Sequence, residues 1–187
     1  MVIGLIVLAG LVMIVLWGAG AYNGLVRLRQ EVKNAWSQID VQLKRRHDLI
    51  PNLVEAVKGY LAHERQTLEA VIKARTQAVS ASGFQDKAEA ENRLTQTLRS
   101  LLVVVERYPD LKANQNVQAL QEELTSTENR ISFARQFYND QAARLNTAIE
   151  SVPTSVIASS TGFMKAEFFQ LDDAADRQAP QVKLSDS

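Results

Sequence analysis

Hydrophobic residues recur at helical spacing along most of the chain. Apolar side chains return at steps of three and four, the spacing of one face of an α-helix, and no comparable run alternates with the period of two that strands show. The clearest stripe consists of Val117, Leu120, Leu124, Thr127, Ile131, Ala134, Tyr138, Gln141, Leu145 and Ile149. The pattern therefore predicts an all-α fold in which long helices pack against one another.

Breaks in the pattern set the expected helix boundaries. Ser80–Gly83 has the composition of a loop, and the residues before Pro109 and Pro153 are disfavoured in a helix. Asn114 or Asn116 can cap the helix that follows Pro109. With a further break near residue 47, the pattern predicts four helices at about 22–46, 48–80, 86–108 and 115–151.

Pro51 decides where the first of these helices ends. Inside a continuous helix a proline costs about 3 kcal/mol and produces a kink. If Asp48 is an N-cap, Pro51 falls in the first turn of a new helix, where its missing N–H has no helical partner anyway. We therefore expect the break at His47–Asp48. The alternative is one kinked helix over residues 22–80.

The N-terminus has the character of a membrane anchor. Residues 1–26 contain no charged side chain, and about 20 apolar residues suffice to cross a bilayer as a helix. Trp17 and Tyr22 lie at the far end, where aromatic rings favour the headgroup level. A signal peptide carries a positively charged segment before its apolar run, and no such segment precedes the run here. The expected organisation is an anchor (1–22), a helical bundle (23–170) and a polar tail (171–187) with a disordered composition.

Charge asymmetry predicts the orientation of this single span. Only two acidic residues, Glu31 and Asp40, lie between residues 27 and 46. The same stretch contains six basic residues, which are Arg27, Arg29, Lys33, Lys44, Arg45 and Arg46. The positive-inside rule then places the N-terminus outside and the bundle in the cytoplasm. A bundle on the extracytoplasmic side is the alternative.

Composition limits the chemistry that the chain can carry. Its 187 residues include 21 basic and 21 acidic side chains, so it lacks the basic excess of a nucleic-acid binder. Without cysteine it has no disulfide, thiolate metal site or cysteine nucleophile. The Glu-x-x-His motif of di-iron bundles, the Gly-x-Ser-x-Gly elbow and a glycine-rich phosphate loop are also missing from the sequence. We therefore expect no catalytic residue, cofactor or metal, and we identify no small-molecule substrate.

The two histidines are the remaining candidates for chemistry. His47 falls on an apolar stripe, where a structural role at a helix end is the simpler interpretation than a ligand or pH sensor. His63 and Glu64 could bind a metal together with Glu55 or Glu69 and form a hydrolytic site. A solvated helix face explains them more simply.

Charges beside the third stripe suggest a buried contact. Glu128 and Arg135 lie seven residues apart, which is two helical turns on one face. In a bundle they can pair with a basic residue of a facing helix, such as Arg45, Arg46 or Arg75. Buried pairs of this kind tend to set register more than they stabilise.

Aromatic residues mark the segment after Pro153. A helical turn is expected over residues 155–160, followed by Phe163, Phe168 and Phe169, three of the six phenylalanines in the chain. Apolar side chains at this density predict that the segment docks on a bundle, either its own or that of a neighbour.

Seven stretches carry a more distinctive sequence: Tyr22–Arg27, Ala35–Glu55, Lys58–Glu64, Tyr108–Asn114, Thr127–Ile131, Ala134–Asn139 and Gly162–Phe169. Together they resemble the bacterial LemA family. The resemblance implies a membrane-anchored, antiparallel up-and-down four-helix bundle in the bacterial cytoplasmic membrane, with no catalytic residue to carry over. Because genes of this family often lie near those for membrane proteases, it also implies membrane partners in envelope quality control.

The functional expectation follows from the anchor, the long amphipathic helices and the lack of catalytic motifs. We expect a non-enzymatic, single-pass scaffold or adaptor that contacts the lipid bilayer and either forms homo-oligomers or docks on another membrane protein. Confinement to a membrane makes even weak contacts effective. The alternative is a transmembrane sensor or signalling bundle, and a metal-dependent hydrolase comes last.

Overall fold

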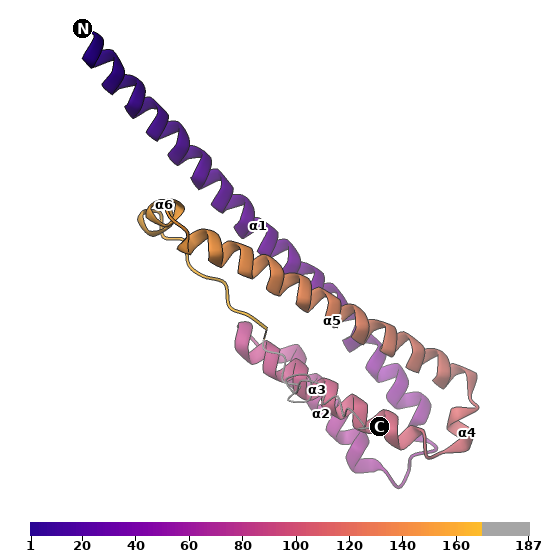
Figure 1. Ribbon diagram of the computed structural model, residues 1–187. Helices are drawn as coiled ribbons and strands as arrows, with labels where there is room; N and C mark the ends of the chain where they lie inside the picture. The colour runs from indigo at the N-terminus through magenta and orange to yellow at the C-terminus, as the bar shows by residue number, and fades with distance from the viewer. Residues whose placement is uncertain (170–187) are drawn as a thin grey trace, which may run out of the picture.

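The computed structural model describes residues 1–169, and this part of the chain contains helices and no strand (Figure 1). The all-α prediction is confirmed. The predicted tail, 171–187, lies outside the described residues. The helices are α1 (Val2–Lys58), α2 (Arg65–Ser80), α3 (Phe84–Val105), α4 (Pro109–Lys112), α5 (Gln115–Glu150) and α6 (Thr154–Ser160).

The predicted break at His47–Asp48 is wrong. Helix α1 is continuous from the N-terminal apolar segment to Lys58, so Asp48 is an exposed residue inside the helix and not an N-cap, and Pro51 also lies within it. A proline at position 51 leaves the carbonyl of His47 without its helical donor. The Arg75 side chain of α2 replaces that donor, with its Nε 2.7 Å from the carbonyl oxygen. A tertiary contact thus offsets part of the cost of the proline.

The alternative, a single helix over 22–80, is also wrong, because α1 ends at Lys58 and α2 begins at Arg65. The chain turns at this point so that Leu61 enters the core, where it is fully buried. The other boundaries follow the sequence more closely. Gly83 precedes α3 with a φ of 88°, a conformation that favours glycine. The side chain of Asn114 caps α5 by accepting hydrogen bonds from the N–H groups of Asn116 and Val117.

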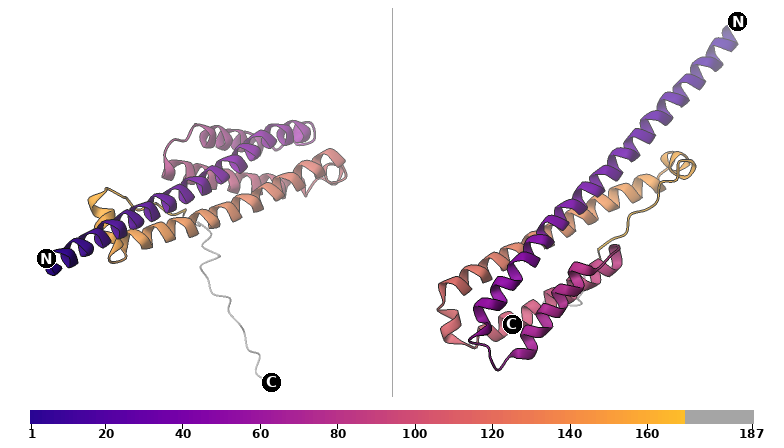
Figure 2. Two further views of the ribbon diagram at one scale, coloured as in Figure 1. Left: turned by 90° about the horizontal axis from the view of Figure 1, so that it is seen from above. Right: turned by 180° about the vertical axis from the view of Figure 1, so that it is seen from behind.

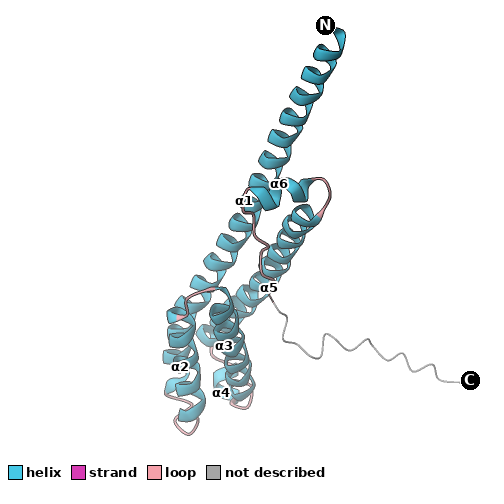
Figure 3. Ribbon diagram, turned by 90° about the vertical axis from the view of Figure 1, so that its left-hand side faces the viewer, coloured by secondary structure: helices cyan, strands magenta, loops and turns pink. Residues whose placement is uncertain are grey.

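Two antiparallel helix pairs form the bundle. Helices α1 and α5 run side by side over most of their length, and the α2–α3 hairpin packs across the half that is far from the N-terminus (Figures 1 and 3). The first part of α1 projects beyond all other elements (Figure 2). Its most apolar stretch is long enough to cross a membrane, and none of that stretch is buried inside the protein.

The bundle has two separate hydrophobic clusters. The distal cluster joins the end of α1 to α2, α3, α4 and the start of α5, with Leu53, Val71, Leu101 and Val117 fully buried. The proximal cluster, nearer the apolar segment, joins α1 and α5 to α6 and the chain up to Phe169. What lies between the two clusters is polar.

Candidate functional site: a buried ionic layer and an exposed aromatic groove

Arg46 occupies the boundary between the two clusters. On α1 it follows Leu43 of the proximal cluster and precedes Ile50 of the distal one, and its side chain is completely buried. Glu91, also completely buried, occupies the same level on α3. Thr127 does so on α5, between Leu124 and Ile131. A polar layer therefore crosses the bundle where both clusters stop.

The Arg46 guanidinium binds partners on two helices. It forms an ion pair with Glu91 of α3 and a second, 2.5 Å, pair with Glu128 of α5. Its Nη1 also donates to the hydroxyl of Thr95 at 2.7 Å. One cation thus faces two carboxylates in a site with little water, and such charge-assisted contacts are strong only when both partners are present.

Glu91 has basic residues of α1 on both sides. Its Oε1 lies 2.9 Å from Nε2 of His47, and its Oε2 contacts Arg46. Burial by itself raises the pKa of the Glu91 carboxyl, but contact with His47 and the charge of Arg46 outweigh burial and hold the pKa below its usual value. Glu91 is therefore an ionised partner in the layer at neutral pH.

Arg135 extends the layer toward the C-terminal segment. Its Nη1 donates to Oδ1 of Asn92 at 2.8 Å, and its guanidinium lies 5.1 Å from the ring centre of Phe169. Burial and the nearby charge of Arg46 lower the pKa of Arg135, while Glu91 and Glu128 partly restore it. The two α5 residues singled out from sequence thus face different partners: Glu128 meets Arg46, one of the three basic residues considered, and Arg135 meets α3 and Phe169.

Glu91 was missed at the sequence level, although a signal for it exists. It lies three residues before Leu94 and so continues the buried stripe of α3 through Leu98, Leu101 and Val105. A charged residue on an apolar stripe indicates a buried partner of opposite charge. Because the sequence does not show which helices are neighbours, that partner could not be identified.

Four aromatic rings hold the C-terminal segment on the bundle. Trp36, Phe84, Tyr138 and Phe169 lie with ring centres 4.8 to 5.7 Å apart. The Tyr138 hydroxyl donates to the carbonyl of Glu167, and burial together with the Glu167 charge raises the Tyr138 pKa. Phe169 is buried, whereas the neighbouring Phe168 is half exposed.

Two asparagines of α5 reinforce this attachment. The Asn139 side chain hydrogen-bonds both the N–H and the carbonyl of Phe169, and Asn146 does the same with Ala166. Three extended residues span about 10 Å, the rise of seven helical residues, so the two pairs match in spacing. Earlier in the same segment, Phe163 contacts two residues of α1. Its ring centre lies 5.9 Å from that of Tyr22, and the Arg29 guanidinium lies over its ring. The segment docks on its own bundle.

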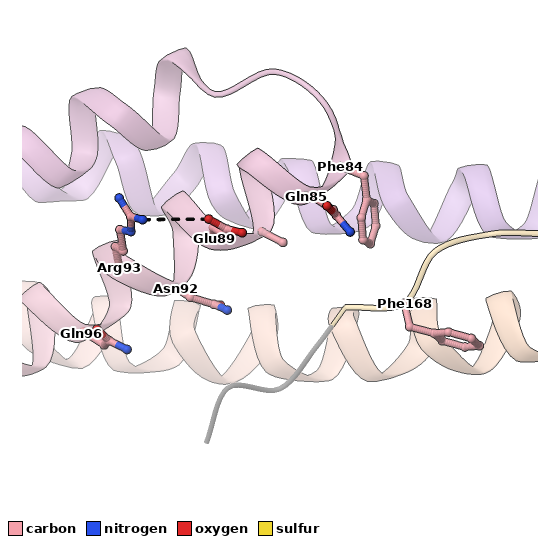
Figure 4. Close-up of a pocket in the computed structure, with 8 residues that line it drawn as sticks. Phe84, Gln85, Glu89, Asn92, Arg93, Gln96 and Phe168 are labelled. Atoms are coloured by element: carbon pink, nitrogen blue, oxygen red, sulfur yellow. Dashed lines mark ion pairs between the residues drawn. The ribbon is translucent and has the colours of Figure 1, made fainter. Parts of the chain in front are cut away.

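A cavity of about 420 Å³ lies on the outer side of α3. Its side chains are spread along the helix, from Phe84 to Gln96, and Phe168 lies across from them (Figure 4). The marked ion pair, Arg93 with Glu89, joins two exposed side chains of one helix at 4.0 Å. Neither a nucleophile with a base nor a set of metal ligands lines this cavity.

The candidate hydrolytic residues do not converge. His63 is exposed in the turn after α1, and the side chain of Glu64 contacts the Tyr108 hydroxyl at 3.4 Å. Within residues 1–169, no group of three or more histidine, aspartate and glutamate side chains could hold a metal ion.

An apolar groove opens on the outer face of the α1–α5 pair. Its volume is about 420 Å³, and Val41 of α1 faces Phe133 and Phe137 of α5 across it. Phe133 is 72% exposed and Val41 63%, which is unusual for large apolar side chains on a packed helix pair. Gln38, Gln42, Arg130 and Ala134 complete the lining of what we call the α1–α5 groove.

Known proteins are similar to this chain over most of its length. A sequence model described as the LemA family matches residues 35–184. Magnetosome protein MamQ 2 of Paramagnetospirillum magneticum is 26% identical over 83% of this chain, and the match spans 66% of its own length, just under two thirds. Magnetosome protein MamQ of Magnetospirillum gryphiswaldense is 25% identical (86% and 70% of the two chains), and protein LemA of Metamycoplasma hominis is also 25% identical (82% and 71%).

Proposed function

Because the chain belongs to the LemA family, we propose that it is a non-enzymatic, membrane-anchored scaffold that associates with further copies of itself through the α1–α5 groove. The names of the family and of the relatives are not those of enzymes, which supports the first part. The observation that carries the second part is the exposure of Phe133, Phe137 and Val41 on one face of an otherwise well-packed bundle.

The continuity of α1 favours a second copy as the partner. No break separates the apolar segment from the groove, and the 20 residues from Ala21 to Val41 rise about 30 Å along the helix. Every copy in one membrane therefore presents its groove at the same height. Two copies can therefore meet by lateral diffusion with their grooves already at the same distance from the membrane, and confinement to the membrane raises their effective concentration.

The chemistry of the groove also suits contact between like surfaces. Two phenylalanines and a valine form its apolar part, and the amides of Gln38 and Gln42 can each donate and accept hydrogen bonds. Arg130 is the one charged residue in the lining. Such a face can meet its own copy with little charge repulsion, and buried aromatic residues commonly dominate interface energies.

Cross-linking in membranes tests the proposal. The Phe133→Ser/Phe137→Ser variant removes the apolar part of the groove. The matched control, Ile72→Ser/Val79→Ser, removes two apolar side chains of similar exposure (49% and 57%) from α2. We expect the wild type and the control to give a cross-linked dimer or higher oligomer, and the groove variant to lose it while keeping its helical circular dichroism.

Three outcomes contradict self-association through the groove. The first is a wild-type chain that stays monomeric in membranes, and the second is a groove variant that cross-links to itself as well as the control does. The third is a groove-dependent cross-link to a different membrane protein, for example a member of a membrane protease system, the class of partner that the family resemblance implies. That result would replace the second copy with a different partner and place the scaffold in envelope quality control.

We also propose that the bundle lies in the cytoplasm, with the N-terminus across the cytoplasmic membrane. The excess of basic residues just after the apolar segment supports this orientation. It requires α1 to span the bilayer from Val2 to about Ala21, which matches the stretch whose side chains are exposed.

A further inference from the structure

Helix α6 packs on the end of the proximal cluster and also lies beside the apolar segment of α1. A methyl group placed on Gly18 would be 3.7 Å from Cδ1 of Ile157, so α6 sits at the level of Gly18. Gly18 precedes Arg27, the first charged residue of the chain, by nine residues, or about 13 Å of helix. Trp17 and Tyr22, rings of the type that favour the headgroup region, flank this level. Helix α6 is therefore held within the depth of the bilayer boundary.

The exposed side chains of this element are those of Val156 and of the hydroxyl residues Ser159 and Ser160. Ile157 faces α1 and Ala158 is buried, whereas Val156 is 64% exposed. Two neighbouring apolar side chains, Val152 before the helix and Met164 after it, are each 84% exposed. Nothing in residues 1–169 covers these three side chains. Their element adjoins, at Gly18, the exposed apolar segment of α1 that is long enough to cross a membrane.

The hydroxyls at the end of α6 have partners within the protein. Those of Ser159, Ser160 and Thr161 each donate to a carbonyl of the same helix, at 3.1, 3.0 and 2.6 Å. The Ile157 carbonyl also accepts the N–H of Thr161, and the Ala158 carbonyl accepts that of Phe163, so these groups do not depend on water. An element with internally satisfied polar groups and outward apolar side chains suits an environment poor in water.

We propose that α6, with Val152 and Met164, inserts into the boundary between headgroups and acyl chains on the bundle side of the membrane. It would form a second lipid attachment beside the transmembrane span. Two basic side chains follow on the bundle side and suit contact with phosphate groups: Arg29, which stacks on Phe163 about 16 Å of helix beyond Gly18, and Lys165, which pairs with Glu150. Two attachments restrict the tilt of the bundle, since one helix alone can pivot.

Spin labels read this depth directly, because the chain has no native cysteine. Val156→Cys and Met164→Cys are labelled in the full chain and reconstituted in vesicles of phosphatidylcholine and phosphatidylglycerol. The accessibility of each label to oxygen, which enters lipid, is compared with that to a water-soluble nickel complex. Val12→Cys, within the span, is the lipid-exposed control, and Val103→Cys, 56% exposed on α3 and outside the α1–α5 groove, is the water-exposed control.

We expect the ratio of oxygen to nickel accessibility at 156 and 164 to be several-fold higher than at 103 and to approach that at 12. Ratios equal to that at 103 would overturn the proposal, because they would place α6 in water. Low accessibility to both reagents would also overturn it, because a protein surface would then cover α6. The readout concerns single labelled chains, so it is independent of whether the groove mediates self-association.

Discussion

Replacing Glu91 by glutamine tests the energetic role of the ionic layer. The substitution keeps the shape of the side chain, so it opens no cavity, but it removes the negative charge that faces Arg46 inside the bundle. Both side chains are completely buried. Removing one partner of a buried pair costs about 3 to 5 kcal/mol, because the remaining charge is left without compensation.

The contacts of Arg46 set the expected value within that range. Arg46 keeps its 2.5 Å pair with Glu128 and its hydrogen bond to Thr95, so we expect a loss near the lower limit, about 3 kcal/mol. For a domain of this size, 1 kcal/mol corresponds to about 2 to 4 °C in Tm. The apparent Tm, followed by circular dichroism in lipid nanodiscs, should fall by roughly 6 to 12 °C.

Glu89→Gln on the same helix provides the matched control. Glu89 and its partner Arg93 are 70% and 67% exposed and 4.0 Å apart, and an exposed pair of this kind contributes less than about 1 kcal/mol. A loss of Tm for Glu91→Gln no greater than that for Glu89→Gln would show that the buried charge of Glu91 does not stabilise the fold. The double variant Arg46→Met/Glu91→Leu should cost less than Glu91→Gln alone, because it removes the pair without leaving a buried charge.

The remaining predictions concern other contacts of the bundle. Because the fold lowers the pKa of Glu91, the contribution of this carboxylate to the free energy of unfolding is complete above its unfolded pKa of about 4.3 and is lost as pH falls through the lower folded value. The Tm of the wild type should therefore fall more steeply below about pH 4 than that of Glu91→Gln. Parallel curves of Tm against pH would contradict this. Arg75→Met leaves the His47 carbonyl without a donor and should cost about 1 to 3 kcal/mol in thermal melts, and an unchanged Tm would mean that water replaces the guanidinium. Asn139→Ala removes two hydrogen bonds to Phe169 and should speed limited proteolysis of the C-terminal segment, while cleavage at the wild-type rate would show that the aromatic rings suffice. A maleimide that cannot cross membranes should label Ser100→Cys, exposed on α3, only after lysis, and labelling in intact cells would place the bundle outside the cytoplasm.

The regular stripe of α5 explains why an ionic layer is needed. Val117, Leu124, Ile131, Tyr138 and Leu145 repeat at every seventh position, so a slip of α5 by two turns would still place apolar residues on apolar residues. Such a slip would separate Glu128 from Arg46. We therefore expect the layer to select one register among several that the apolar contacts allow, the role for which buried polar groups are best attested.

Sequence alone determined the features that depend on local order. The helical period of the apolar positions predicts the all-α class and the extent of α5, because residues three and four positions apart lie on the same face of a helix. The Asn114 cap and the Gly83 turn follow from side-chain and backbone chemistry within a few residues. The uncharged segment before Arg27 indicates a membrane helix from length and composition only.

Tertiary structure decided the features in which distant residues compensate one another. Pro51 disfavours a continuous helix locally, yet α1 continues through it, and Arg75 of another helix offsets part of the cost by supplying the missing donor. Asp48 has the chemistry of a cap, but no helix begins there. The pairing of Arg46 with Glu91, the asparagine contacts to residues 166 and 169, and the placement of α6 beside Gly18 all join segments far apart in the chain. A periodic pattern shows which face of a helix is buried, but the packing of the whole bundle decides which neighbour covers that face.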